Sequence, residues 1–169
     1  LLKMVNHIAI NSQVTSIRHA AAILGQRELK KWINTVITKE LCADRPNEVA
    51  RTSMLRAKFM ESLAPVFGLG TKSAEVFLMG LFSILNIILN MPMEDAMKMV
   101  TVSKEIEDAL VRGTGDLAGI YSFVVNYEAA DWQEISRQLI VLNVDTNTIY
   151  QAYTETVCWY KEMFFETSV

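Results

Sequence analysis

Apolar residues recur along this chain at intervals of three and four positions, which is the period of an amphipathic α-helix. Between residues 25 and 41, for example, Leu29, Trp32, Ile33, Val36 and Ile37 form one continuous apolar face. No run of strict apolar–polar alternation marks a half-buried strand. The pattern therefore predicts an all-α fold, a compact multi-helix domain.

Capping and turn residues divide this pattern into separate helices. Gly25, Pro92 and Gly113 mark helix ends or starts, and Asp131 with Glu134 forms a D-x-x-E capping box before an apolar run. The predicted helices cover residues 16–24, 25–41, 46–64, 73–89, 92 onward, 103–112, 114–130, 131–142 and the end of the chain to about 165. The interpretation is one helical domain over residues 1–169.

The stretch FLMGLFSILNII at 77–88 has no charged residue, and only Gly80, Ser83 and Asn86 interrupt its apolar character. The apolar run from Val76 to Leu89 is shorter than the roughly 20 residues needed to span a bilayer. We therefore expect a central buried helix covered by amphipathic neighbours, and no membrane contact.

Composition narrows the class of protein further. The chain of 169 residues is 51% apolar and 21% charged, which is globular, and its net charge of −3 gives no basic footprint for nucleic acid. Its two cysteines, Cys42 and Cys158, lie in no metal-binding motif and read as free thiols of a cytoplasmic protein. The chain opens without methionine or signal peptide, so we expect a piece of a longer protein.

Several segments together resemble one family of bacterial signalling domains. They are LLKMVN, TSIRHAAAILGQRELKKW, RAKFMESLAP, FLMGLFSILNIILNMPMEDAM, SKEIEDALVRGTG and YEAADW. In this order they are similar to the HDOD domain, the HD-related output domain, and most similar to the version, also called modified HD-GYP, that follows an EAL domain in cyclic-di-GMP signalling proteins. The resemblance implies an HD-like helical fold, truncated here at its N-terminal side.

HD-type phosphohydrolases hold divalent metals with histidines and aspartates, and the metals generate the attacking hydroxide. The resemblance aligns their His-Asp pair with Ser83 and Ile84, and an upstream histidine with a position near Thr52. None of these three can serve as such a ligand. The two histidines of the chain, His7 and His19, fall at none of these aligned ligand positions, so we expect no catalytic residue, no metal and no cofactor.

Arg56 interrupts the apolar face that Val49, Phe59, Met60 and Leu63 form on the 46–64 helix. Arginine is costly to bury unless it is paired. It either snorkels, or bridges to a carboxylate or to helix-end carbonyls, or lies near the former metal pocket and holds it shut or binds an anionic group.

The last helix carries one predicted core-facing stripe of Ile149, Tyr153, Val157, Tyr160 and Phe164. Trp159 and Phe165 fall outside that stripe, as does Cys158. A second apolar edge of this kind either docks on another domain or subunit or packs on helices of the domain that are missing from this chain.

We conclude from the sequence that the chain is a non-catalytic signal-transduction and protein-interaction module associated with cyclic-di-GMP-type signalling. Its expected partner is another protein or an adjacent EAL or signalling domain, and a homo-oligomer is possible. Two alternatives remain open: a divergent metal-dependent phosphohydrolase, and a small-molecule sensor that binds a nucleotide in the former HD pocket near Arg56 and Ser83.

Overall fold

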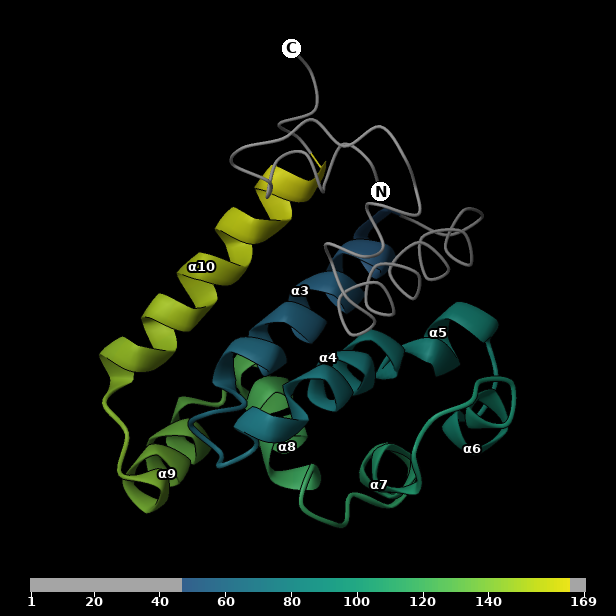
Figure 1. Cartoon of the computed structure of the whole chain (residues 1–169), viewed down its shortest axis with the longest axis horizontal. Helices are drawn as coiled ribbons and strands as arrows, with labels where there is room; N and C mark the ends of the chain where they lie inside the picture. Colours follow the sequence, from purple (N-terminus) through teal and green to yellow (C-terminus); the bar gives the residue numbers. More distant parts are fainter. Residues whose placement is uncertain (1–46, 165–169) are drawn as a thin grey trace.

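The computed structural model describes residues 47–164, and this part of the chain is helical without strands (Figure 1). The predictions for residues before 47, including the two first helices and the positions of His7, His19 and Cys42, lie outside the described residues. The all-α prediction is confirmed. The helices are α3 (Asn47–Leu63), η1 (Gly70–Lys72), α4 (Ser73–Phe82), α5 (Leu85–Leu89), α6 (Met93–Met97), α7 (Lys104–Glu107), the π-helical turn η2 (Asp108–Arg112), α8 (Ala118–Glu128), α9 (Trp132–Leu142) and α10 (Thr146–Phe164).

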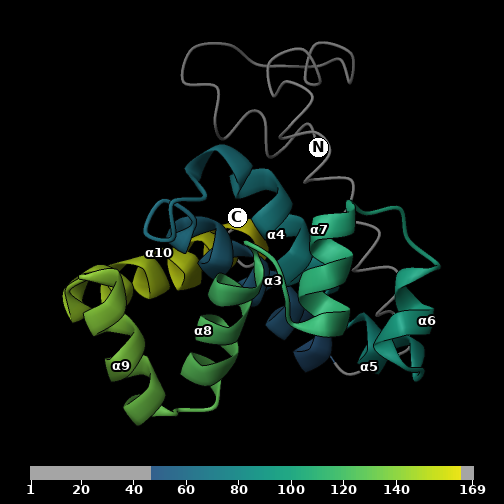
Figure 2. The same cartoon turned by 90° about the horizontal axis from the view of Figure 1, so that it is seen from below.

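Helix α3 is the centre of the arrangement, because α4, α8 and α10 all pack against it (Figures 1 and 2). Its inner face buries Met54, Ala57, Phe59, Met60 and Leu63. Short helices α5, α6 and α7 lie on the side of α4, while α9 reaches the core mainly through α8. The core therefore forms around the crossing of α3 and α4.

The helix ends follow the capping signals of the sequence. Ser103 caps α7 by accepting a hydrogen bond from the Ile106 amide, and Asp131 caps α9 by accepting one from the Glu134 amide. Gly113 ends η2 with a φ of 64°, and Asn143 ends α9 with a φ of 52°. Both are left-handed positions, which glycine and asparagine tolerate better than other residues.

The predicted central helix is buried, but it is broken in the middle. Helix α4 ends at Phe82 and α5 begins at Leu85, with Ser83 and Ile84 in the turn between them. The Ser83 hydroxyl donates to the Gly80 carbonyl across 2.7 Å. This local bond competes with the regular helical pattern, so the serine that interrupts the apolar run also interrupts the helix.

The apolar segment is longer than the sequence argument allowed. Gly70–Leu89 comprises 20 residues with a mean hydropathy of 1.6, so length and composition alone do not distinguish it from a membrane span. Burial is more informative, because 61% of its most apolar window lies inside the protein. That is the behaviour of a core helix surrounded by its own domain.

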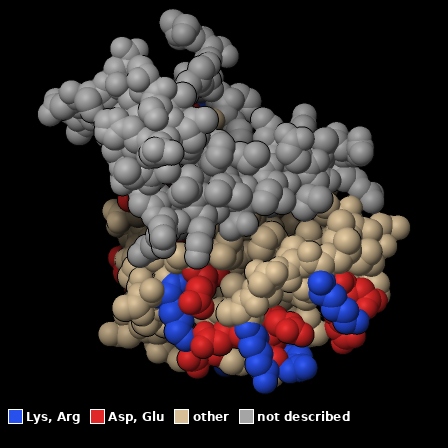
Figure 3. Space-filling view, turned by 45° about the vertical axis from the view of Figure 1, so that its right-hand side comes forward, with Lys and Arg blue, Asp and Glu red and all other residues tan. Residues whose placement is uncertain are grey.

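Methionines fill much of this core. Met79 and Met97 are buried, and Met91 and Met93 pack partly buried against the core. Met99 differs from them: it follows the end of α6 at Met97, and its side chain is 64% exposed. On the face seen in Figure 3, basic and acidic side chains alternate and do not segregate by sign.

Candidate functional site

Arg56 lies within the buried face of α3, as the sequence pattern predicted, and its side chain is only 11% exposed. Its guanidinium Nη1 donates to the hydroxyl of Ser83 across 2.8 Å. Ser83 sits in the turn between α4 and α5 and is 4% exposed. The structure thus brings together two of the residues singled out in the sequence, although 27 positions separate them.

Glu128, at the end of α8, neutralises this buried cation. Its two carboxylate oxygens accept from Nε of Arg56 at 3.0 and 3.1 Å, and one of them also accepts from Nη2 at 2.5 Å. Such a two-pronged pair of a carboxylate and a guanidinium is the strong and directional form of an ion pair. Bridging to a carboxylate, one of the interpretations left open for Arg56, is therefore observed.

The sequence argument did not single out Glu128, which is 72 residues away from Arg56. The sequence did contain a sign that Glu128 matters, because this residue belongs to the YEAADW segment on which the family resemblance rests. We refer to Arg56, Ser83 and Glu128 as the Arg56 cluster. The cluster ties three segments together: α3, the turn after α4, and the end of α8.

The Ser83 hydroxyl both accepts and donates a hydrogen bond. It accepts from Arg56 and donates to the Gly80 carbonyl. The next residue, Ile84, is 4% exposed and belongs to the hydrophobic core. At Thr52, the third aligned position, the hydroxyl donates to the carbonyl of Glu48 in the preceding turn of its own helix, across 2.8 Å.

Helices α3 and α4 approach each other very closely beside the cluster. A Cβ placed on Gly80 would lie 2.5 Å from the Cα of Ala57, so only glycine fits there. The buried hydroxyl of Ser53 donates to the Leu81 carbonyl across 2.6 Å and adds a second link between these helices. The position expected to correspond to an HD metal site is therefore occupied by tightly packed helices and an ion pair.

No group of three or more histidine, cysteine, aspartate or glutamate side chains within residues 47–164 is arranged to hold a metal ion. Glu128 is the carboxylate of the Arg56 cluster, but both its oxygens already accept hydrogen bonds from Arg56. What the arrangement does chemically is to compensate a buried charge and to fix the α8 end against α3 and α4. His7 and His19 lie outside the described residues.

Trp159 lies on the packed side of α10, which contradicts the prediction that it falls outside the core-facing stripe. Its ring meets Phe77 of α4 edge-on at 6.4 Å, and Nζ of Lys58 lies 5.7 Å from the ring centre. The face of α10 that packs inward begins at Ile149 and continues through Ala152 and Thr156, so it is rotated toward Trp159. Phe165 lies outside the described residues, and Cys158 is exposed.

An aromatic cluster lies next to the Arg56 cluster, where α3, α8, α9 and α10 meet. Tyr127 is its centre: its ring centroid is 5.1 Å from Phe59, 5.5 Å from Tyr153 and 5.6 Å from Trp132. Burial, and then the neighbouring tyrosines Tyr153 and Tyr150, raise the pKa of the Tyr127 phenol. These rings pack against each other and anchor the α8–α9 corner.

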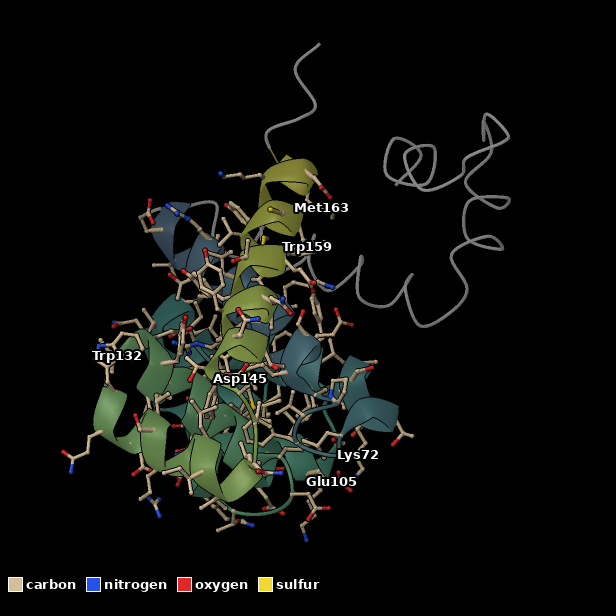
Figure 4. The ribbon with its side chains drawn as sticks, turned by 90° about the vertical axis from the view of Figure 1, so that its left-hand side faces the viewer. Lys72, Glu105, Trp132, Asp145, Trp159 and Met163 are labelled. Carbon is tan, nitrogen blue, oxygen red and sulfur yellow. The ribbon has the colours of Figure 1, made fainter. Side chains whose placement is uncertain are left out.

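Figure 4 shows how these groups are distributed around α10. Trp159 lies on the upper part of α10, Trp132 lies at the far edge on α9, and Lys72 and Glu105 lie close together at the bottom. Lys72 donates to Glu105 across 2.7 Å, which raises the pKa of the lysine. This pair links η1 to α7 and is separate from the Arg56 cluster.

Comparisons with known proteins give two relatives that match almost the whole chain. The cyclic di-GMP phosphodiesterase CdgJ of Vibrio cholerae is 25% identical over 165 residues, which is 96% of this chain and 38% of that protein. The uncharacterized protein YuxH of Bacillus subtilis is 27% identical over 167 residues, which is 94% of this chain and 39% of that protein. The chain thus spans about two-fifths of the length of these curated relatives. Neither a family model nor a solved structure matches it.

Proposed function

We propose that this chain is a non-catalytic module of the HDOD type that relays a signal through protein contacts in a cyclic-di-GMP signalling system. Two findings support the signalling context. The chain is similar over nearly its whole length to part of a protein named as a cyclic di-GMP phosphodiesterase. Its all-helical fold is the one that the HDOD resemblance implies. Because the match covers 38% of that relative, its phosphodiesterase activity is not carried over.

The hydrogen bond between Arg56 and Ser83 is the observation that most directly supports a non-catalytic role. The resemblance puts the metal-binding His-Asp pair of HD enzymes at Ser83 and Ile84. In this chain the first is bonded to a guanidinium cation 2.8 Å away, and the second is a core side chain. A fixed positive charge at that distance opposes the binding of a divalent cation.

Rebuilding a hydrolytic site around Glu128 would also be costly. Hydrolysis of a phosphodiester by this class of chemistry requires a metal held by several imidazole or carboxylate groups. If Glu128 turned toward a metal, Arg56 would be left buried without its charge partner, a change that is strongly destabilising. The same ion pair that stabilises the fold therefore disfavours the enzyme.

The activity test uses the intact chain with manganese and cyclic di-GMP, and follows the linear dinucleotide product by chromatography. We expect no product above the rate of the metal-containing buffer. Hydrolysis by the wild-type chain that disappears in His7→Ala or His19→Ala would overturn the proposal and establish the divergent phosphohydrolase. The His→Ala variants distinguish this outcome from a contaminating enzyme, since a contaminant is unaffected by them.

The sensor alternative has one observation in its favour, which is the accessibility of Glu128. Its side chain is 33% exposed, so the Arg56–Glu128 pair borders on solvent, where a dissolved anion could compete with the carboxylate for the guanidinium. A ligand that binds only the native state raises the melting temperature. A thermal-shift panel of nucleotides tests this: a shift for one nucleotide in the wild type that is absent in Arg56→Gln supports the sensor. If no nucleotide raises the melting temperature, the sensor alternative is rejected.

A further inference from the structure

Ala130, at the corner between α8 and α9, has a left-handed backbone conformation with a φ of 57°. A residue with a Cβ is destabilised in this region, whereas glycine adopts it without strain and asparagine tolerates it better than alanine does. The other residues of positive φ within 47–164 are all glycine or asparagine: Gly68, Asn90, Gly113, Gly115 and Asn143. Backbone strain of this kind is therefore greatest at Ala130 in the described part of the chain.

The hydrogen bonds of this corner are those of a Schellman motif. The Asp131 amide donates to the Asn126 carbonyl across 3.0 Å, and the Ala130 amide donates to the Tyr127 carbonyl across 3.1 Å. The left-handed position of this motif is usually glycine. The corner is thus well bonded, and its strain comes from the Cβ of the alanine.

Two sets of side-chain contacts hold the end of α8 just before this strained residue. The carboxylate of Glu128 accepts hydrogen bonds from Arg56 through both oxygens. The ring of Tyr127 packs against Phe59, with the ring centroids 5.1 Å apart. A strained backbone persists only where the surrounding structure fixes it in place. The ion pair and the ring contact fix the α8 end in this way.

Helix α9, beyond the corner, is held by fewer contacts. Among the described helices it packs mainly on α8, at the outer edge of the domain (Figure 2). Of its side chains, only Ile135 and Leu139 are buried. It also ends at a second left-handed residue, Asn143, with a φ of 52°. Helix α9 is thus a short rigid element between two single-residue joints, which is the arrangement of a hinged segment.

We propose that the Arg56–Glu128 ion pair is a latch, which holds the corner closed against the strain at Ala130. When the pair breaks, the last turn of α8 and helix α9 detach together, and Ala130 leaves its left-handed conformation. Elements with few buried contacts open locally at a lower free energy than the whole domain unfolds, and α9 is such an element. An event that takes Glu128 from Arg56 therefore moves α9.

This inference deepens the proposed function, because it names the element that moves when a signal is relayed. Only that use in a relay rests on the proposed function. The opening of the corner itself is a property of the fold, which an enzyme can possess as well. Hydrolysis of cyclic di-GMP tests the proposed function, and the experiments below test the latch, so either can fail without the other.

The first experiment follows amide hydrogen exchange of the 169-residue chain by NMR under native conditions. The amides of residues 135–142 report on α9, and those of Met60 and Leu63, buried in α3, are the reference. We expect the α9 amides of the wild type to exchange at least about tenfold faster than the reference, because α9 opens locally. Glu128→Gln should accelerate the α9 amides by a further factor of about ten, because opening no longer breaks a charged pair.

Glu105→Gln is the control, since it removes the carboxylate of an ion pair that links η1 to α7. Its α9 amides should exchange at the wild-type rate. The latch would be overturned by α9 amides that are as protected as Met60 and Leu63 in the wild type. It would also be overturned by Glu128→Gln amides in α9 that exchange no faster than those of the wild type or of Glu105→Gln.

The second experiment tests the strain with two neighbouring alanines. Ala129 and Ala130 are both exposed, but Ala129 has an ordinary φ of −76°. Ala130→Gly removes the strain that favours opening, so its α9 amides should exchange at least about threefold more slowly than in the wild type. Ala129→Gly only adds backbone freedom, so its α9 amides should exchange faster. An Ala130→Gly variant whose α9 amides exchange as fast as those of the wild type would show that Ala130 does not drive the opening, and would overturn the proposal.

Discussion

Arg56 donates a hydrogen bond to Ser83 across 2.8 Å, and this contact joins α3 to the break between α4 and α5. The break is the point where the HDOD resemblance would put the metal ligands of an HD enzyme. A serine permits it, since its hydroxyl bonds back to Gly80 and also accepts from the arginine. Ser83 therefore links α3 to the α4–α5 break at the position where that resemblance would put a metal ligand.

Glu128→Gln should destabilise the fold by about 1–2 kcal/mol, because it removes the negative charge that compensates the buried Arg56. The estimate is kept low because Glu128 is itself one-third exposed, and water recovers part of the loss. Urea unfolding monitored by circular dichroism measures the change.

Glu105→Gln is the matched control for this change, since Glu105 also pairs with a cation but is 51% exposed. An exposed pair contributes about 0–1 kcal/mol, so this variant should unfold close to the wild type. Equal losses of unfolding free energy for the two variants would show that the Arg56–Glu128 pair stabilises the fold no more than an exposed ion pair does.

Gly80→Ala should be among the most harmful single-methyl additions in the described part of the chain. The new Cβ would lie 2.5 Å from the Cα of Ala57, and a backbone atom cannot move aside as a side chain does. Overpacking of this kind costs about 1–3 kcal/mol or more. Differential scanning calorimetry would register a lower melting temperature.

Gly119→Ala, at a second helical glycine, should change the stability in the opposite direction. A Cβ at Gly119 in α8 meets no atom within 4 Å, so the alanine gains helix propensity without a clash. We expect stabilisation by about 0.5–1 kcal/mol. A Gly80→Ala variant as stable as Gly119→Ala would contradict the close approach of α3 and α4.

Glu134 should titrate far below an ordinary glutamate. Hydrogen bonds from Arg137 and then Gln138 lower the pKa of its carboxyl from 4.5 to about 2. A depressed carboxyl pKa contributes stability that is fully present above the unfolded value, near 4.5, and is lost as the pH falls toward about 2. Carbon-detected NMR titration of the Glu134 side chain should give a midpoint well below 4.

In Glu134→Gln, the acid-induced loss of α9 stability between these two pH values should shrink, since the titrating group is gone. Glu162, an exposed glutamate on α10, is a suitable comparison site for the same substitution. A Glu134 midpoint near 4.5 would show that the Arg137 contact does not persist in solution.

Sequence periodicity and capping residues predicted most helices well, because the signals are local. Ser103, Gly113 and Asp131 each act within one turn of their own position. The break at Ser83 was missed since a single serine within an apolar run does not reveal whether its hydroxyl will bond to a nearby carbonyl. Trp159 was misplaced by a rotation of α10, which depends on Phe77 and Lys58 in other helices.

For the candidate site, sequence reasoning identified Arg56 and Ser83 but not the residue that completes the cluster. Arg56 was conspicuous as a charge in an apolar stripe, and such a charge requires a partner. Which of the chain's 19 acidic residues would supply it depends on the packing of α8 against α3, over a separation of 72 positions. The need for an ion pair was therefore predictable, whereas the identity of Glu128 was not.

The metal content of the purified chain tests the central claim most directly. The protein is saturated with manganese, passed through a desalting column and analysed for metal and protein together. If Ser83 and Ile84 have replaced the ligands and Arg56 repels cations there, bound manganese should be far below one equivalent in both wild type and Glu128→Gln. One or two equivalents in the wild type that are lost in Glu128→Gln would show that the Arg56 cluster opens to form a metal site, and would contradict the account.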